Sequence, residues 1–212
     1  MAVRGMGVGK IGAVVLAGGR SSRMGAHKLL LPLGERPVAA YALDAALEGG
    51  ADPVVVVLGH RADDVRAALP DGNYRVVMNS DYAAGMSTSL RAGIAALPPD
   101  VVGAVMLLAD QPLMTGAIVA RVIAESRAGG RGIVTASFGG KRGTPVYFAR
   151  ALFAELLAVT GDEGGRSVIA RHPADVAVVE FAEDTAALDV DDPEQYTRLR
   201  ELWDHYAKGS VG

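Results

Sequence analysis

The sequence predicts an α/β fold, in which one mostly parallel β-sheet is covered by helices on both faces. Apolar runs rich in valine alternate along the chain with segments of helical pattern, as in parallel strands joined by right-handed helical crossovers. Half of the residues are apolar and only 5% are aromatic, which suits strands that are buried on both faces. A chain of 212 residues is long enough for one well-packed domain and short for two. We therefore expect a single domain.

The strands and helices follow from these patterns in chain order. Strands are expected at residues 11–17, 53–58, 74–78, 103–109, 132–138 and 175–181, an extended piece at 28–33, and a loop followed by a strand at 139–148. Helices are expected at residues 38–50, 62–69, 89–97 and 115–130, and from Pro193 onward. Thr115 and Asp192 are expected to cap the helices that follow them. The domain should cover residues 11–206, between a flexible lead at 1–10 and a flexible tail at 207–212.

The charge and the cysteine count exclude several classes of function. The net charge is −3 and no basic block occurs, which argues against nucleic acid as a partner. No apolar run approaches the ~20 residues of a membrane span, and the first ten residues lack the apolar core of a secretion signal. The sequence has no cysteine, which excludes disulfides, zinc–thiolate sites and thiol catalysis. We expect a cytoplasmic protein that does not bind a membrane.

The apolar run at residues 11–17 stops abruptly at a pair of glycines, and several cations follow. Without a Cβ, the backbone at Gly18 and Gly19 can come close to a ligand and turn N–H groups toward phosphate oxygens. Arg23 and Lys28 would add charge. A nucleoside triphosphate site is one interpretation of this stretch, and an ordinary strand-to-helix turn is the other. Its predicted members are Leu16, Ala17, Gly18, Gly19, Ser21, Ser22, Arg23 and Lys28.

Other polar residues follow strands, where parallel sheets collect ligands. Asn79 follows one expected strand, and Ser87 leads into the next helix, which it would either cap or place beside a nucleotide. Asp110 ends a buried strand and is followed by a proline two residues later, so it would either hold a cation or start a turn. In an extended segment Asp189 and Asp191 point to the same face, and both could approach one metal.

The stretch LAGGRSSRMGAHK resembles the signature LAGGxSxRMGxxK of the MobA-like nucleotidyltransferases, which make activated sugars, alcohols and molybdenum cofactors from nucleoside triphosphates. This resemblance implies a Rossmann-like three-layer αβα sandwich, similar to the nucleotide-diphospho-sugar transferases. It also implies that Asp110, in a segment similar to the family's DxP motif, binds Mg²⁺ together with Asp191. Arg23 and Lys28 would assist catalysis. The resemblance further places Ser87 and Ser89 near the nucleotide, and we expect Asn79, which follows the strand at 74–78, to bind the nucleotide as well.

Two downstream segments resemble the acceptor side of the family. GTPVYF is similar to a GxP segment that lines the acceptor pocket, which implies roles for Gly143 and Pro145. GDEGGR resembles a GDxGxR motif of the cofactor-modifying branch, which implies roles for Asp162 and Arg166, and Arg166 near a helix start could hold a phosphate.

Over nearly the whole chain the motifs most resemble the molybdenum cofactor cytidylyltransferases. The implied reaction transfers CMP from CTP to the phosphate of molybdenum-molybdopterin and releases pyrophosphate, and the product would pass to a molybdoenzyme. LAGG is however typical of the guanylyltransferase branch, so GTP is an alternative nucleotide. A sugar-phosphate nucleotidyltransferase and a non-catalytic carrier of the molybdenum cofactor are further alternatives. Against a carrier stand Lys28, Asp110 and Asp191, because a carrier needs no metal clamp.

Overall fold

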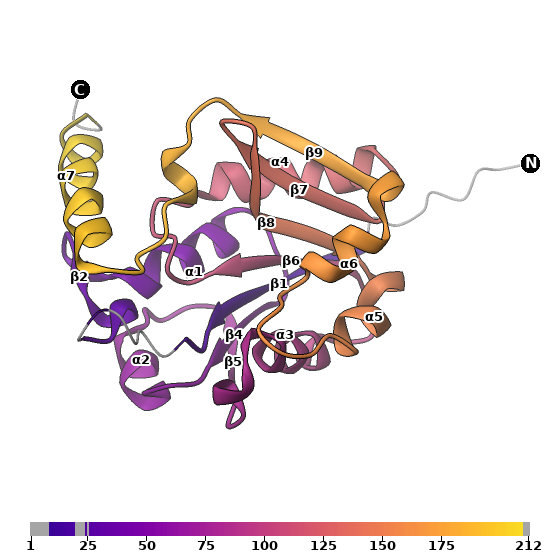
Figure 1. The fold of residues 1–212 in the computed structure, drawn as a ribbon, viewed down its shortest axis with the longest axis horizontal. Coiled ribbons are helices and arrows are strands. Elements are labelled where there is room, and N and C mark those ends of the chain that lie inside the picture. Colours follow the sequence, from indigo (N-terminus) through magenta and orange to yellow (C-terminus); the bar gives the residue numbers. More distant parts are fainter. Residues whose placement is uncertain (1–8, 20–23, 25, 210–212) are drawn as a thin grey trace, which may run out of the picture.

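A central β-sheet of seven strands organises the part of the chain that the structure describes (Figure 1). The structure is a computed structural model and describes residues 9–19, 24 and 26–209, with side chains up to residue 203. The strand order is β5-β4-β1-β6-β8-β7-β9. The bounds are β1 Lys10–Ala17, β4 Val54–Leu58, β5 Tyr74–Met78, β6 Val101–Leu108, β7 Ile133–Phe138, β8 Lys141–Ala149 and β9 Val176–Phe181, and a small second sheet pairs β2 Pro32–Leu33 with β3 Arg36–Pro37.

The large sheet is mostly parallel, as predicted, and β8 is the exception. β1 lies between β4 and β6 and is parallel to both, and β7 is parallel to β9. β8 is antiparallel to both of its neighbours, β6 and β7. The reason is the short turn at Gly139 and Gly140, whose φ angles of 55° and 81° favour glycine. A turn of this length joins only antiparallel strands.

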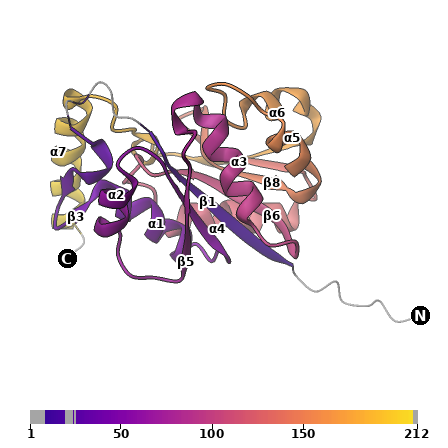
Figure 2. The ribbon, with the colours of Figure 1, turned by 90° about the horizontal axis from the view of Figure 1, so that it is seen from below.

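Helices cover both faces of the sheet and form the predicted three-layer αβα sandwich (Figures 1 and 2). Helices α1 and α4 pack on one face, and α3, α5 and α6 on the other. Alternate residues of β4 enter the two cores: Val54 and Val56 face one, and Val55 and Val57 the other. The bounds are α1 Val38–Glu48, α2 Ala62–Ala68, α3 Met86–Ala96, α4 Gly116–Ala128, α5 Phe153–Leu157, α6 Arg166–Arg171 and α7 Pro193–Gly209. No helix within the described ranges has the length and apolarity to cross a membrane.

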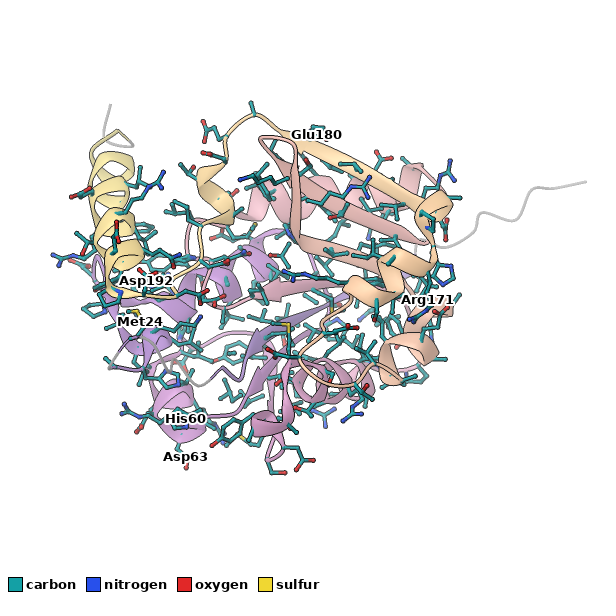
Figure 3. All side chains as sticks on the ribbon, viewed as in Figure 1. Met24, His60, Asp63, Arg171, Glu180 and Asp192 are labelled. Carbon is teal, nitrogen blue, oxygen red and sulfur yellow. The ribbon has the colours of Figure 1, made fainter. Side chains whose placement is uncertain are left out.

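Most expected elements are present, with shifts at their ends. The caps are confirmed, because Thr115 Oγ1 accepts a hydrogen bond from the Ile118 backbone and Asp192 Oδ1 accepts one from the Gln195 backbone. Figure 3 shows Asp192 at the start of α7. The extended piece at 28–33 is wrong in its first half, where Lys28–Leu30 is a 3₁₀-helix closed by a hydrogen bond from the Leu30 N–H to the His27 carbonyl. Most of the expected flexible ends, residues 1–8 and 210–212, lie outside the described residues.

Candidate functional site

A cleft of about 750 Å³ opens at the sheet edge where the parallel strands end. Ligands collect at this edge in open α/β sheets. Segments from the whole length of the chain meet there: the end of β1, the turn before α3, the residue after β6, the loop before α6 and the segment before α7. The lining residues are Leu16, Ala17, Gly18, Gly19, Lys28, Leu29, Tyr82, Ala83, Ala84, Gly85, Met86, Ser89, Leu108, Asp110, Asp162, Arg166, Asp189 and Asp191.

The glycine turn after β1 lies against helix α3. A Cβ on Gly18 would approach Ser89 Oγ to 2.7 Å, so a side chain at this position would collide with the helix. Ser89 is itself held, because its hydroxyl oxygen accepts a hydrogen bond of 2.9 Å from Asn79 Nδ2. The close approach of β1 to α3 therefore requires glycine at position 18. The predictions for Ser21, Ser22 and Arg23 lie outside the described residues.

An ion cluster links two distant acidic segments through one lysine. Lys28 Nζ donates hydrogen bonds to Asp110, two residues after the end of β6, and to Asp191 Oδ1 at 2.7 Å. The side chains of Lys28, Asp110 and Asp191 are 12%, 17% and 36% exposed, so the cluster is only partly solvated. Burial favours the neutral amine, but the two carboxylates outweigh it and raise the pKa of Lys28. Both predicted metal-binding acids thus converge on one cationic nitrogen.

The same two carboxylates fit a divalent cation. Their oxygens reach one point that already holds positive charge, and aspartate oxygens are ligands that Mg²⁺ accepts. Among the described residues no group of three or more histidine, aspartate or glutamate side chains forms a complete protein cage. This is compatible with Mg²⁺, which uses one or two carboxylates and takes its other ligands from water and phosphate.

Asp189 occupies the same end of the cleft but is held differently. Its Oδ1 accepts a hydrogen bond of 2.7 Å from Gln111 Nε2, and Gln111 Oε1 accepts one from the Thr144 hydroxyl. Burial raises the pKa of Asp189, and the nearby charge of Asp110 raises it further. Sequence reasoning gave Gln111 and Thr144 no role. The one available signal was an amide between Asp110 and a proline, after a buried strand.

The start of α3 differs from the prediction in one respect. The cap interpretation of Ser87 is wrong, because α3 begins at Met86 and its N-cap is Gly85, with φ of 111°. Ser87 is 1% exposed, and its hydroxyl oxygen has no hydrogen-bond partner among the residues that the structure describes. Asp162 caps the helix from a distant loop instead, because its Oδ1 accepts a hydrogen bond of 3.1 Å from the Met86 N–H. This contact brings the GDEGGR segment to the cleft.

The residues predicted for the acceptor side divide into two groups. Asp162 and Arg166 line the cleft, and Arg166 is the first residue of α6. Gly143 and Pro145 are not among the lining residues, although Thr144 between them reaches Gln111. Their roles remain predictions.

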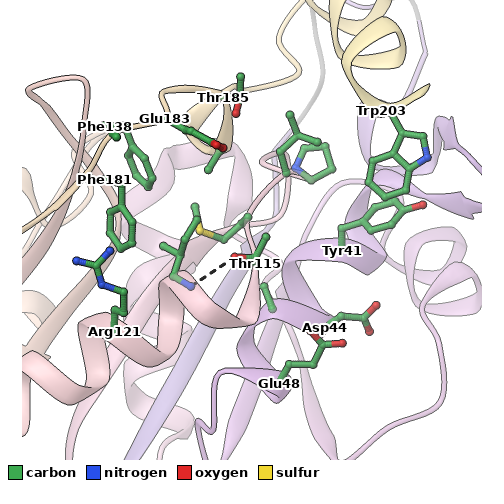
Figure 4. Close-up of a pocket in the computed structure, with 17 residues that line it drawn as sticks. Tyr41, Asp44, Glu48, Thr115, Arg121, Phe138, Phe181, Glu183, Thr185 and Trp203 are labelled. Carbon is green, nitrogen blue, oxygen red and sulfur yellow. Dashed lines mark hydrogen bonds between the residues drawn. The ribbon is translucent and has the colours of Figure 1, made fainter. Parts of the chain in front are cut away.

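A second cavity lies behind the turn that follows Gln111 and has a different lining (Figure 4). Its volume is about 490 Å³, and Pro112–Thr115 form part of its wall. Two aromatic pairs contribute to it, Tyr41 with Trp203 and Phe138 with Phe181. None of the predicted site residues that the structure describes lines this cavity. Of the described site residues, Lys28, Asp110, Asp162, Arg166 and Asp191 line the cleft at the sheet edge instead.

The fold and the cleft define a class: α/β proteins that carry a glycine turn, a lysine and paired carboxylates at the carboxyl edge of the sheet. Residues 13–176 match the model of the MobA-like NTP transferase domain. The chain belongs to this family of nucleotidyltransferases, and the predicted resemblance is confirmed.

The chain is similar to known proteins over most of its length. Nicotine blue oxidoreductase of Paenarthrobacter nicotinovorans is 32% identical over 195 residues, which cover 88% of this chain and 94% of that protein. Rv0371c of Mycobacterium tuberculosis, solved in complex with manganese, has a TM-score of 0.76 and 34% identity, covering 91% of this chain and 98% of that chain. A nucleotidyl transferase from Methanothermobacter thermautotroptrophicus has a TM-score of 0.80 and 26% identity, covering 93% and 99%.

Proposed function

We propose that this protein is a Mg²⁺-dependent nucleotidyltransferase that transfers CMP from CTP to the phosphate of molybdenum-molybdopterin and releases pyrophosphate. The observation that carries the proposal is the convergence of Asp110 and Asp191 on one cationic nitrogen, in a cleft that begins at the glycine turn. A relative that is 34% identical was solved in complex with manganese, which supports a divalent metal ion for this protein.

In this proposal the chain supplies position and charge. Asp110 and Asp191 would hold Mg²⁺, which neutralises charge on the α-phosphate when it is bound. Lys28, together with Arg23, balances the charge of the departing pyrophosphate. An acceptor phosphate is already ionised near neutral pH, so its oxygen can attack the α-phosphorus without a protein base. The bond from the α-phosphorus to the pyrophosphate breaks as the new phosphoanhydride bond forms.

The nucleotide would lie along the end of β1 and the start of α3. Leu16, Ala17, Gly18 and Gly19 line the cleft there, and Ser89 lines it from α3. Asn79 follows β5 and donates a hydrogen bond to Ser89 through its amide, and on this position we assign it to nucleotide binding. We assign Ser87, Ser21 and Ser22 to nucleotide binding on the family resemblance. We favour CTP because the downstream motifs resemble the cytidylyltransferases. GTP is the alternative, because LAGG is typical of the guanylyltransferases.

The acceptor would enter on the side of the loop before α6. Asp162 and Arg166 line the cleft on this side, and a guanidinium binds phosphate by two parallel hydrogen bonds. We assign Gly143 and Pro145 to the same side on the family resemblance, and a molybdoenzyme would receive the product.

A pyrophosphate assay tests the function and separates it from the alternatives. The purified protein is incubated with Mg²⁺ and each of the four nucleoside triphosphates, with molybdenum-molybdopterin or a sugar phosphate as the acceptor. We expect release with CTP and the pterin acceptor, and none when EDTA removes the metal. Release with GTP would indicate the guanylyltransferase, and release with a sugar phosphate would indicate a sugar-phosphate enzyme. No pyrophosphate release in any combination would refute the proposal. It would favour a carrier, or a redox enzyme such as the relative nicotine blue oxidoreductase.

A further inference from the structure

The amide of Gln111 joins three segments next to Asp110 and Asp189, which line the cleft. Gln111 follows Asp110 and is 5% exposed. Its Nε2 donates to Asp189 Oδ1 at 2.7 Å and to the Ala187 carbonyl at 3.5 Å, while its Oε1 accepts from Thr144. A buried polar group costs free energy unless it is paired, and this amide is paired at both ends. Its side chain therefore links the end of β6 to the acidic segment and to β8.

The acidic segment, residues 187–191, carries Asp189 and Asp191 and is held by little regular secondary structure. The 187–191 segment connects the 3₁₀-helix Thr185–Ala187 to α7 and belongs to no strand. A backbone hydrogen bond of 3.0 Å from the Val190 N–H to the Asp110 carbonyl is one tether of this segment. The hydrogen bond from Gln111 to Asp189 is a second tether, and the Asp191 N–H donates a third, of 2.7 Å, to Gln195 Oε1. The side chain of Asp191, next to the first tether, then meets Lys28.

Thr144, at the other end of the link, lies in an irregular part of β8. The register of β7 and β8 shifts where Val146 pairs with Thr135 and Gly143 with Ala136, which leaves Thr144 and Pro145 in a bulge. Bulges turn a side chain out of the strand pattern, and a proline fits there because it has no N–H to pair. The hydroxyl of Thr144 therefore reaches Gln111 instead of following the alternation of β8.

We propose that Gln111 is a positioning residue, whose amide holds the 187–191 segment so that Asp191 meets the cation that it shares with Asp110. The inference rests on the proposed function for its cation. If the hydrogen bond between Gln111 and Asp189 acts only by holding the segment in place, the donor and the charged acceptor can be exchanged between the two positions. An amide at position 189 and a carboxylate at 111 would keep the hydrogen bond between these two residues, with the Thr144 hydroxyl still donating to residue 111, and would lose only the longer bond of 3.5 Å from residue 111 to the Ala187 carbonyl.

Direct measurement of Mn²⁺ binding tests this without turnover. The electron paramagnetic resonance signal of free Mn²⁺ is titrated with the full chain, with and without CTP or GTP. Gln111→Leu should weaken Mn²⁺ binding by about 10- to 100-fold, the usual effect of removing a group that orients a metal ligand. Gln111→Glu alone should also weaken binding, because it opposes Asp189 with a like charge. The exchanged pair, Gln111→Glu with Asp189→Asn, should restore binding to within a few-fold of the wild type.

The control is Tyr74→Phe, which removes a hydrogen bond of 2.6 Å to the Pro70 carbonyl far from the cleft and should leave Mn²⁺ binding unchanged. Unchanged binding in Gln111→Leu, or a failure of the exchanged pair to recover, would overturn the inference. If Gln111→Leu does not fold, the comparison of Gln111→Glu with the exchanged pair decides. Wild-type protein that binds Mn²⁺ but releases no pyrophosphate would refute the function and keep the inference, and wild-type protein that binds no Mn²⁺ would refute both.

Discussion

The variant Lys28→Met tests whether Asp110 and Asp191 form a cation site. The test measures thermal stability and does not require enzymatic turnover. The lysine ammonium lies between the two carboxylates, and methionine keeps a side chain of similar length without its charge. The variant leaves two like charges facing each other in a partly buried place. In EDTA it should therefore be less stable than the wild type.

The exposure of the cluster sets the size of the effect. Breaking a fully buried ion pair costs about 3–5 kcal/mol, and an exposed pair is worth about 0–1 kcal/mol. With side chains between 12% and 36% exposed, we expect an intermediate loss, about 2 kcal/mol of unfolding free energy. For a chain of this size that is a fall of about 4–8 °C in Tm. Saturating Mg²⁺ or Mn²⁺ should recover most of it, because the ion binds the folded state.

The assay is thermal denaturation in EDTA and in increasing Mg²⁺ or Mn²⁺, with Lys10→Met as the matched control. Lys10 pairs with Asp52 at 2.8 Å, and both side chains are 56% exposed. This control should change neither the Tm in EDTA nor the response to metal. If Lys28→Met melts with the wild type in EDTA, or if metal does not raise its Tm, the two aspartates do not form a cation site.

The other predictions concern the cleft and one buried histidine. Asp110→Ala should abolish pyrophosphate release with an unchanged circular dichroism spectrum, because it removes a cleft ligand and no core volume; retained turnover would contradict its role. Arg166→Ala should raise KM for the pterin acceptor more than for the nucleotide in steady-state kinetics. Equal effects on the two KM values would contradict the assignment of Arg166 to the acceptor side of the cleft. Gly18→Ala puts a Cβ 2.7 Å from Ser89 Oγ, so urea unfolding should show a loss of about 1–3 kcal/mol. Adding Ser89→Ala should recover part of that loss, and no recovery would mean that the clash is not the cause. Burial lowers the pKa of the His27 imidazole, so this side chain binds a proton more tightly in the unfolded chain than in the folded one. The free energy of unfolding should therefore fall as the pH drops below about 6.5. His27→Gln should flatten the dependence of Tm on pH, and an unchanged slope would exclude this histidine as its source.

The sequence predicts the sheet well because strand burial leaves a local signal. Valine runs such as β4 are apolar at every position, since helices cover both faces of the sheet. The 3₁₀-helix Lys28–Leu30 has no such signal, because a short run of leucines fits a strand or a helix equally. The Leu30 N–H bonds to the His27 carbonyl three residues back, and no apolar pattern in the sequence distinguishes that bond from strand pairing.

The acids of the site were predicted from motifs, and the contacts between them were not. Lys28 and Asp191 are 163 positions apart, and Gln111 and Asp189 are 78 apart. Such pairs exist only once the strands are ordered, and no local pattern encodes them. Asp162 illustrates the same limit: its motif suggested a ligand contact, while its hydrogen bond to the Met86 N–H depends on two loops meeting in space.

The reversed strand β8 has a consequence for how such a protein can diversify. The other strands of the large sheet deliver their last residues to the edge that bears the cleft, whereas β8 delivers its first. The hairpin at Gly139 and Gly140 projects from that edge, and surface turns accept insertions that buried strands do not. A longer or shorter hairpin would change this edge of the sheet and leave the ends of β1 and β6 unmoved. Length changes can thus be confined to the tip of the hairpin, beyond Thr144 and the hydrogen bond that it donates to Gln111.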